Sequence, residues 1–285
     1  MALSLSFLCR SIRHVRLFSN GKGVLMNIVV CIKQVPDSDK VTIDRETNRL
    51  NRAGVPSIIN PFDENALEMA LQLKDAHGGK VTVISMGPPQ AEEALRTALS
   101  HGADEAVLIS DRKFGGADTW ATSYTISLAV KKLGDVDLVL FGKQAIDGDT
   151  AQVGPGVAHF LDIPALTYAK AVEVTGETLK VTKVTEDGYE VWDIDKPCAL
   201  TVVKEANQLR MPSLKKKMAA KKAEIPCWGF NELQPDEEKI GLAGSPTKVS
   251  KVFAPPVKLN KEILSGEPAE MITELIQKLK ERNVL

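Results

Sequence analysis

The sequence lacks the features that would mark several common classes of protein. Lysine and arginine together number 36 and aspartate and glutamate 37, so the chain has no basic excess of the kind that a nucleic-acid-binding protein shows. No apolar run reaches the length of about 18 residues that a membrane-spanning helix needs. The four cysteines contain no CxxC pair, which excludes a cysteine zinc site and a disulfide framework on spacing grounds. With 44% hydrophobic and 26% charged residues, the chain is predicted to be globular, with reduced thiols.

Several motifs of familiar active sites are also missing. The chain has no GxxxxGK[ST] phosphate loop, no GxGxxG, no HExxH and no Ser/His/Asp order typical of a hydrolase. We therefore predict no catalytic residue and no metal ligand in this chain. If the protein takes part in a redox reaction, a bound cofactor has to supply the chemistry.

The first 25 residues differ in composition from the rest. They contain three arginines, one lysine, four serines and no acidic residue. An Arg-rich, Ser-rich and acid-free amphipathic leader is typical of a mitochondrial transit peptide. The segment RLFS (16–19) resembles a matrix-peptidase site with cleavage after Phe18. We therefore expect residues 1–25 to act as a transit peptide that directs the chain to the mitochondrial matrix; the alternative is a cytoplasmic protein that starts at Met26.

Beyond Met26, short apolar runs alternate with helical patterns. Runs at residues 27–35, 80–85, 105–109 and 136–141 predict four buried strands. The segments between them predict helices, one with Asp63 as its N-cap and Gly78 at its end, and one that ends at Gly102. This alternation predicts an α/β fold with a doubly wound parallel sheet. Ligands on such sheets bind at the carboxyl ends of the strands, where the strand order reverses.

The second half of the chain has a different periodicity. Period-two patterns at residues 171–174, 179–184 and 189–194 predict an antiparallel β meander that returns through residues 198–203. The stretch 36–59 is polar, and a hairpin or an excursion is expected around residues 44–52. Residues 228–260 are predicted to be extended and too polar for a core element. A last helix, over about residues 268–282, has an apolar stripe formed by Met271, Ile272, Leu275, Ile276 and Leu279.

The loop GKQAIDGDTAQVGP (142–155) carries the strongest local signal for binding. It follows a predicted strand and leads into a helix that is expected to start near Thr150. Asp149 and Gln152 have the spacing of a capping box. A strand–loop–helix corner directs main-chain N–H groups and the positive end of a helix dipole to one point, which suits phosphate. An ordinary turn with a good cap would explain the local pattern equally well.

Four segments together resemble the β subunit of electron transfer flavoproteins. They are VCIKQVPD (30–37), NPFDENALEMAL (60–71), VISMGPPQAEEALRTALSHGADEAVLI (83–109) and GKQAIDGDTAQVGP (142–155). The resemblance implies a sheet of the adenine nucleotide alpha hydrolase-like type and a heterodimer with an FAD-carrying α subunit. It also implies electron transfer with acyl-CoA or other flavin dehydrogenases, as in fatty acid oxidation, and a nucleotide bound within this chain.

The same resemblance implies a division of the chain into parts. A nucleotide-binding domain is expected over residues 26–222, including the meander (164–203) and a recognition loop (204–222). A C-terminal arm, residues 223–285, is expected to wrap the α subunit. In the segment RMPSLKKKM (210–218), Leu214 matches the leucine that anchors this loop in a partner dehydrogenase. An exposed leucine beside lysines suits a transient anchor with electrostatic steering, although a solvated helix face would account for the lysines equally well.

The resemblance also places the nucleotide site, at the carboxyl ends of the first, second and fourth predicted strands. Asn60 is expected to read an adenine edge and the 142–153 loop to hold phosphates. Simple packing is the alternative reading for Cys31 and Met86. The expected site residues are Cys31, Asn60, Pro61, Phe62, Asp63, Met86, Gly142, Lys143, Gln144, Ala145, Ile146, Asp147, Gly148, Asp149, Thr150, Ala151, Gln152 and Val153.

Members of this family hold one of two ligands at this position. Those that bind AMP typically show the pattern Asp-Asp-Asp-x-Asn-Gln-Thr-Gly-Gln, where this chain reads DGDTAQVGP (147–155). The chain is more similar to the electron-bifurcating members, which hold a second FAD. Glycine at position 148 removes a negative charge and a side chain beside the phosphates. We therefore predict FAD, with NAD(H) as its reductant, and AMP as the alternative.

Three rival functions are compatible with the same fold. An ATP-dependent synthase of this fold carries a Ser-Gly-Gly-x-Asp-Ser loop after the first strand, where this chain reads KQVPD (33–37) without glycine. A nucleotide-sensing protein, or a structural subunit with a relic pocket, would bind a nucleotide without electron transfer. The visible absorbance of the purified complex distinguishes an electron carrier from a synthase.

Overall fold

The computed structural model describes residues 25–37, 42–44, 49–51, 56–250 and 262–285. Residues 1–24 lie outside the described residues, so the expected transit peptide stays a prediction. The chain divides into two compact units, one that ends at Lys248 and one that begins at Val249, and each is described by itself. In the described part of the chain, no helix combines the length and the apolar character needed to cross a membrane.

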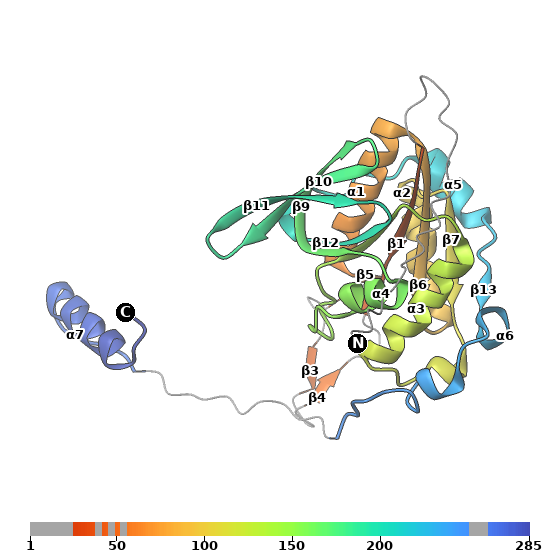
Figure 1. The fold of residues 1–285 in the computed structure, drawn as a ribbon. Coiled ribbons are helices and arrows are strands. Elements are labelled where there is room, and N and C mark those ends of the chain that lie inside the picture. Colours follow the sequence, from red (N-terminus) through yellow and green to blue (C-terminus); the bar gives the residue numbers. More distant parts are fainter. Residues whose placement is uncertain (1–24, 38–41, 45–48, 52–55, 251–261) are drawn as a thin grey trace, which may run out of the picture. The chain divides into compact units, whose positions relative to one another are not determined.

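Nine strands form the main sheet of the first unit, in the order β11-β10-β9-β12-β8-β1-β6-β7-β13 (Figure 1). All neighbouring strands from β9 to β13 in this order are parallel, whereas β10 pairs antiparallel with β9 and with β11. The strands are β1 (Met26–Cys31), β6 (Gly79–Met86), β7 (Glu105–Ile109), β8 (Leu138–Gly142), β9 (Ala165–Thr175), β10 (Thr178–Thr185), β11 (Gly188–Asp195), β12 (Cys198–Val202) and β13 (Cys227–Trp228).

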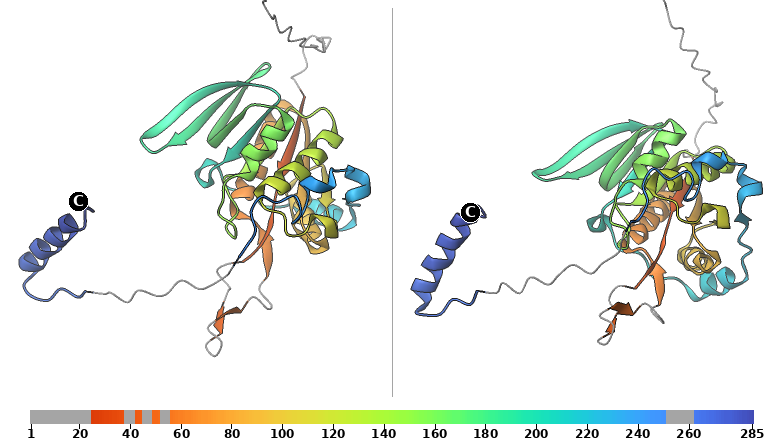
Figure 2. Two further views of the ribbon diagram at one scale, coloured as in Figure 1. Left: turned by 60° about the horizontal axis from the view of Figure 1, so that its bottom comes forward. Right: turned by 90° about the horizontal axis from the view of Figure 1, so that it is seen from below.

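Helices cover both faces of the parallel part of this sheet. Both sides of its strands are therefore buried, which explains why these strands are continuous apolar runs in the sequence. On β1, Val30 packs in one core with Leu67 of α1, and Val29 packs in another core with Ile126 of α3 and Val157 of α4. The predicted doubly wound sheet is therefore confirmed, and the meander strands project beyond the helices (Figure 2). The helices of this unit are α1 (Pro61–His77), α2 (Glu92–His101), α3 (Thr119–Leu133), α4 (Val153–Leu161), α5 (Leu214–Lys222) and α6 (Phe230–Leu233).

The strand order reverses between β1 and β8. From β1 the chain proceeds to β6 and β7 on one side, and then crosses to β8 and β12 on the other side. The register aligns Cys31 with Ile84 of β6 and with Phe141 of β8. The carboxyl ends of these three strands therefore meet at one edge of the sheet, as predicted, and this edge is where an open α/β sheet holds its ligand.

The first helix begins earlier than the sequence predicts. Its N-cap residue is Asn60 and its first residue is Pro61, so the expectation that Asp63 caps the helix is wrong. Proline suits the first helical turn because its missing N–H would have no partner within the helix. The predicted end of this helix, at Gly78, is confirmed.

The helix after the 142–149 loop begins later than predicted. It starts at Val153 rather than near Thr150, and the predicted capping box of Asp149 with Gln152 is wrong. Asp149 and Ala151 have φ values of 53° and 54°, in the left-handed region, so the chain is not yet helical there. Gln152 is the N-cap residue, and the described residues give it no side-chain cap hydrogen bond.

Two segments outside the main helices add further strands. The hairpin expected around residues 44–52 is present as an antiparallel pair, β3 (Thr42–Asp44) and β4 (Arg49–Asn51). Nearby, β2 (Gln34–Pro36) pairs with β5 (Ser57–Ile59). Residues 228–260 were expected to be too polar for the core, but β13 extends into them at the sheet edge, and Leu233 and Ile240 are buried against the α3 face. The expectation is wrong for residues 228–240, because a few isolated apolar side chains suffice to anchor a polar segment, and residues 251–260 lie outside the described residues.

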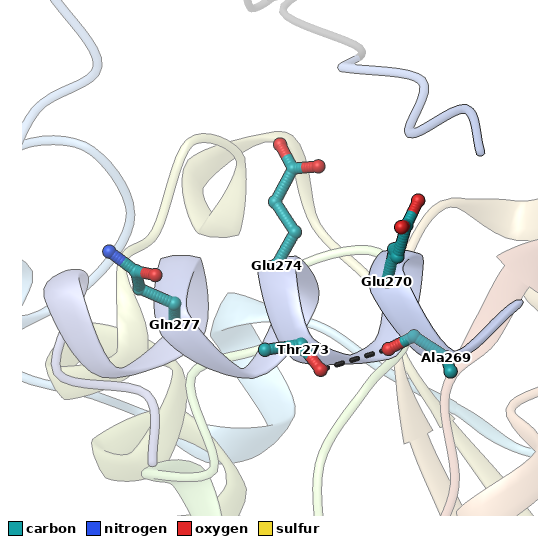
Figure 3. A pocket seen from close by; sticks show the side chains of 5 residues that line it. All are labelled: Ala269, Glu270, Thr273, Glu274 and Gln277. Atoms are coloured by element: carbon teal, nitrogen blue, oxygen red, sulfur yellow. Dashed lines mark hydrogen bonds between the residues drawn. The ribbon is translucent and has the colours of Figure 1, made fainter. Parts of the chain in front are cut away.

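The second unit contains α7 (Pro268–Glu281), close to the bounds predicted for the last helix. Its stripe residues Ile272, Leu275 and Ile276 are all exposed. A hollow of about 440 Å³ lies along a different face of this helix (Figure 3). One helix supplies all its lining residues, so the hollow has only one wall and does not resemble a ligand pocket. The lining residues are Ala269, Glu270, Thr273, Glu274 and Gln277.

Candidate nucleotide-binding site

The buried carboxylate of Asp63 joins three elements at the point where the strand order reverses. Its Oδ2 accepts a hydrogen bond from the main-chain N–H of Lys33, just after β1, at 2.7 Å. Its Oδ1 accepts a hydrogen bond from the N–H of Gly142, the last residue of β8, at 3.1 Å. Because Asp63 lies in the first turn of α1, this one side chain fixes the start of the helix against the ends of two strands.

Burial raises the pKa of Asp63 from 3.8 to about 7, although its hydrogen bonds to Asn60, Lys33 and Gly142 act in the opposite direction. Burial and the nearby carboxylate also raise the pKa of the Cys31 thiol at the end of β1 well above its usual value. Cys31 is therefore a neutral thiol that packs in the wall of the site, which argues against a nucleophilic role.

The side chain of Asn60 holds the next part of the loop. Its Nδ2 donates to the carbonyl of Gln144 at 2.8 Å, and its Oδ1 accepts from the N–H of Ile146 at 3.1 Å. Asn60 is only 1% exposed. With both ends of its amide bound to the loop, Asn60 is placed to shape the 144–146 backbone, and direct contact with an adenine edge stays a prediction.

Gly142 permits this close approach. A Cβ atom at this position would lie 2.3 Å from Oδ1 of Asp63 and 2.6 Å from the carbonyl carbon of Phe62. Real Cβ contacts are never that short, so any other residue would push α1 away from β8. Gly148 is different, because a Cβ atom there would meet none of the described residues within 4 Å. The loop therefore leaves open space around Gly148.

The acidic side chains of the loop are paired. Lys33 Nζ lies 2.7 Å from both carboxylate oxygens of Asp147, and Gln144 Nε2 donates to Asp149. Both members of the Lys33–Asp147 ion pair are partly exposed. Two aspartates beside a phosphate would repel it, so the pairing of Asp147 with Lys33 reduces the electrostatic cost of an anionic ligand at this loop.

Some main-chain N–H groups of the loop are bonded within the protein, and others lie at the start of a helix. Those of Gly142, Lys143, Ile146 and Asp149 donate to protein acceptors and so shape the loop. The N–H groups of Val153 and Gly154 belong to the first turn of α4, where a helix offers donors without intrahelical partners. A phosphate bound by this loop would therefore lie toward Gly148 and the start of α4, where Gly148 and Thr150 are exposed.

The remaining predicted residues lie around the same edge. Pro61 and Phe62 form the first turn of α1 and are half-buried, and Met86 is half-buried at the end of β6. Lys143 places its Nζ 5.3 Å from the ring centroid of Tyr168. Sequence reasoning missed Lys33, whose signal is a lysine directly after the first strand. Leu214 lies apart from this site, at the start of α5, and is 75% exposed.

Comparison with known proteins gives consistent matches. The family described as Electron transfer flavoprotein domain matches residues 47–232. An electron transfer flavoprotein subunit beta of Clostridium acetobutylicum is 53% identical over 260 residues, which cover 91% of this chain and all of the relative. The caffeyl-CoA reductase-Etf complex subunit CarD of Acetobacterium woodii is 48% identical over 262 residues, with the same coverage of both chains. Protein FixA of Azorhizobium caulinodans is 47% identical over 244 residues, 83% of this chain and 87% of the relative.

Replacement of Gly142 by alanine should destabilise the chain, whereas replacement of Gly148 should not. We expect Gly142→Ala to lower the free energy of unfolding by about 1–3 kcal/mol, because α1 has to move to make room for the new Cβ. Gly148→Ala should change it by less than about 0.5 kcal/mol. Urea unfolding of the full chain checks both values, and equal stabilities of the two variants would contradict the close approach at Gly142.

The raised pKa of Asp63 predicts a pH dependence of stability. Between pH 3.8 and about 7 the folded chain holds more protons at this group than the unfolded chain. The stabilising contribution is therefore present at low pH and is lost as the pH rises through about 7, with a slope of at most about 1.4 kcal/mol per pH unit. The measurement is the unfolding free energy of the wild type minus that of Asp63→Asn across this range. A difference that increases with pH would contradict the raised pKa.

Proposed function

The chain belongs to the β subunits of the electron transfer flavoprotein family, and we propose that its 142–153 loop holds the phosphates of a redox nucleotide. In this role the chain would pass electrons between flavin dehydrogenases and downstream acceptors as one half of a heterodimer. β subunits of this family pair with an α subunit. The observation that carries the proposal is the Asp63 bridge, which fixes the loop at the sheet edge where α/β folds bind ligands.

The residues of this corner suit an adenine dinucleotide. Gly142 brings α1 and β8 together, Asn60 shapes the loop, and Lys33 neutralises Asp147. The exposed turn at Gly148 and the first turn of α4 then remain to bind phosphate oxygens. FAD bound here would supply the redox chemistry, while the protein supplies position and electrostatics. This division of roles between cofactor and protein is consistent with the sequence, which predicts no acid–base motif.

We infer FAD rather than AMP from the space around Gly148. A Cβ there would meet none of the described residues within 4 Å, so an aspartate could be accommodated at this position without a clash. Because glycine stands there instead of aspartate, an open part of the loop carries one negative charge fewer, which favours the binding of a pyrophosphate. On this reading the heterodimer is of the bifurcating type and accepts electrons from NADH. An ordinary AMP-binding β subunit is the second candidate.

The other candidates of the same fold receive less support. In ATP-dependent synthases of this fold, a glycine-rich loop after the first strand binds pyrophosphate. Here that place is taken by β2, a strand without glycine that is paired with β5. The sequence identity to electron transfer flavoprotein β subunits extends over nearly the whole chain, which favours electron transfer over nucleotide sensing.

Two surfaces support interactions with other proteins. Leu214 and its neighbouring lysines would serve as the anchor for a partner dehydrogenase. An anchor has to be accessible to the partner, and Leu214 is exposed. The apolar stripe of α7, which is exposed in its own unit, would contact the α subunit. An exposed stripe of this kind is expected to be covered in the complex, because large apolar patches seldom stay exposed to water.

The nucleotides released from the purified heterodimer test the cofactor proposal. We expect two FAD per dimer and bleaching of the flavin absorbance by NADH. Gly148→Asp should lose the FAD of the β subunit, because it restores a negative charge beside the phosphates, whereas Gly148→Ala should retain it. One FAD and one AMP per wild-type dimer would contradict the FAD assignment and leave the ordinary AMP-binding type.

We also propose that residues 1–25 direct the chain to the mitochondrial matrix. The support is compositional: the segment is basic and acid-free, and 32 basic minus 37 acidic residues leave the remainder at −5. The relatives named above are bacterial proteins, so the proposal depends on this segment alone. N-terminal sequencing of the mature protein should find Ser19 or a residue close to it, and a mature chain that starts at Met26 would contradict import.

A further inference from the structure

Helix α1 holds a second segment in addition to the nucleotide loop. Glu68, in the middle of α1 and only 4% exposed, accepts hydrogen bonds from Nε and Nη2 of Arg210 at 2.9 and 3.0 Å. The main-chain N–H of Arg210 also donates to Glu68 Oε2 at 3.1 Å, and Nη1 donates to Asp75 at 2.6 Å. A bidentate pair of this kind, between a buried carboxylate and a half-buried guanidinium, fixes geometry as well as charge, so the chain at Arg210 is held in one position.

Two further contacts hold the residues around Arg210. The side chain of Asn65 donates to the carbonyl of Asn207 at 2.7 Å, and the side chain of Asn207 donates to the carbonyl of Asn65 at 3.0 Å. His101, the last residue of α2, places Nδ1 2.7 Å from the carbonyl of Arg210. The chain from Asn207 to Arg210 is therefore fixed to both α1 and α2.

Arg96 of α2 holds the other end of the segment. Its Nη1 donates to the carbonyls of Ala220 and Ala223 at 2.8 and 3.1 Å, at the carboxyl end of α5. Glu92, one turn earlier on α2, orients the guanidinium by accepting from Nε at 2.9 Å. A cation at this end of a helix satisfies unpaired carbonyls and interacts favourably with the helix dipole.

Three apolar side chains between these two attachments are exposed. Met211 is 87% exposed and Leu214 75% exposed, and Met218 follows one turn later on α5. Ser213 caps the helix by accepting from the N–H of Lys216 at 3.2 Å. We call residues 207–223 the docking segment: its two ends are fixed, and its middle presents apolar side chains beside exposed lysines.

We propose that Arg210 and Arg96 are positioning residues that hold the docking segment in the conformation in which Leu214 enters a partner dehydrogenase. The proposal rests on the docking role proposed for Leu214. A segment ordered in advance loses less conformational entropy when it binds, and this lowers the cost of a small interface. The exposed lysines of α5 suit a partner whose apolar pocket has an acidic rim.

A positioning role and a purely structural role for the two arginines predict different effects of their replacement. If the arginines only stabilise the fold, their replacement should lower the unfolding temperature and leave the affinity for the partner unchanged. If they position the segment, replacement should raise the KM for the partner while the kcat at saturation and the nucleotide content stay the same. Arg210→Lys keeps the charge but loses the bidentate geometry, and so separates these two cases.

The experiment uses the purified heterodimer and an acyl-CoA dehydrogenase that reduces it. We expect Leu214→Ala to raise the KM for the heterodimer by about tenfold, as for the central residue of a small interface. Arg210→Lys and Arg96→Gln should each raise KM severalfold and speed hydrogen exchange in the docking segment. Arg112→Gln, which removes an exposed arginine elsewhere, is the control and should change neither quantity.

The KM values of these variants distinguish the docking role of Leu214 from the positioning role of the arginines. An unchanged KM for Leu214→Ala would remove the docking role and the positioning role with it. A raised KM for Leu214→Ala together with a wild-type KM for both arginine variants would overturn the positioning role alone. If Arg210→Lys does not fold, the double variant Glu68→Gln, Arg210→Gln avoids an unpaired buried charge and carries the same prediction.

Discussion

The structure depends on one carboxylate that accepts hydrogen bonds from the main chain of two strands. Asp63 binds the N–H of Lys33 after β1 and the N–H of Gly142 at the end of β8, and it does so from the first turn of α1. The approach is possible only because Gly142 has no Cβ. A buried acceptor that satisfies two main-chain donors fixes the loop without the need for a bound ligand.

Helix α1 holds both regions to which we assign a function. Its first turn holds the 142–149 loop through Asp63 and Asn60, and its middle holds the docking segment through Asn65 and Glu68. The proposed nucleotide site and the proposed docking surface are therefore attached to the same helix. For an electron carrier this arrangement is useful, because the rate of transfer depends on how the cofactor is placed relative to the docked partner.

Much of the fold could be predicted because local patterns determine it. The apolar runs of β1, β6, β7 and β8 and the helix ends at Gly78 and Gly102 follow from periodicity and from glycine. The role of Asp63 could not be predicted, since an acid near the start of a helix fits the pattern of an N-cap. Its actual donor at Gly142 is 79 residues away in sequence. The same limit applies to Asp149, whose left-handed backbone rules out the capping box that its spacing suggests.

We propose that the turn at Gly148 and the start of α4 bind the phosphates of a nucleotide. Hydrogen exchange of the heterodimer, before and after its nucleotides are removed, tests this most directly. We expect removal to speed exchange at the amides of Gly148 and residues 150–154, whereas the amides of Gly142, Ile146 and Asp149, which donate to acceptors within the protein, change much less. Unchanged exchange at Gly148 and residues 150–154, with faster exchange elsewhere, would contradict binding at this loop.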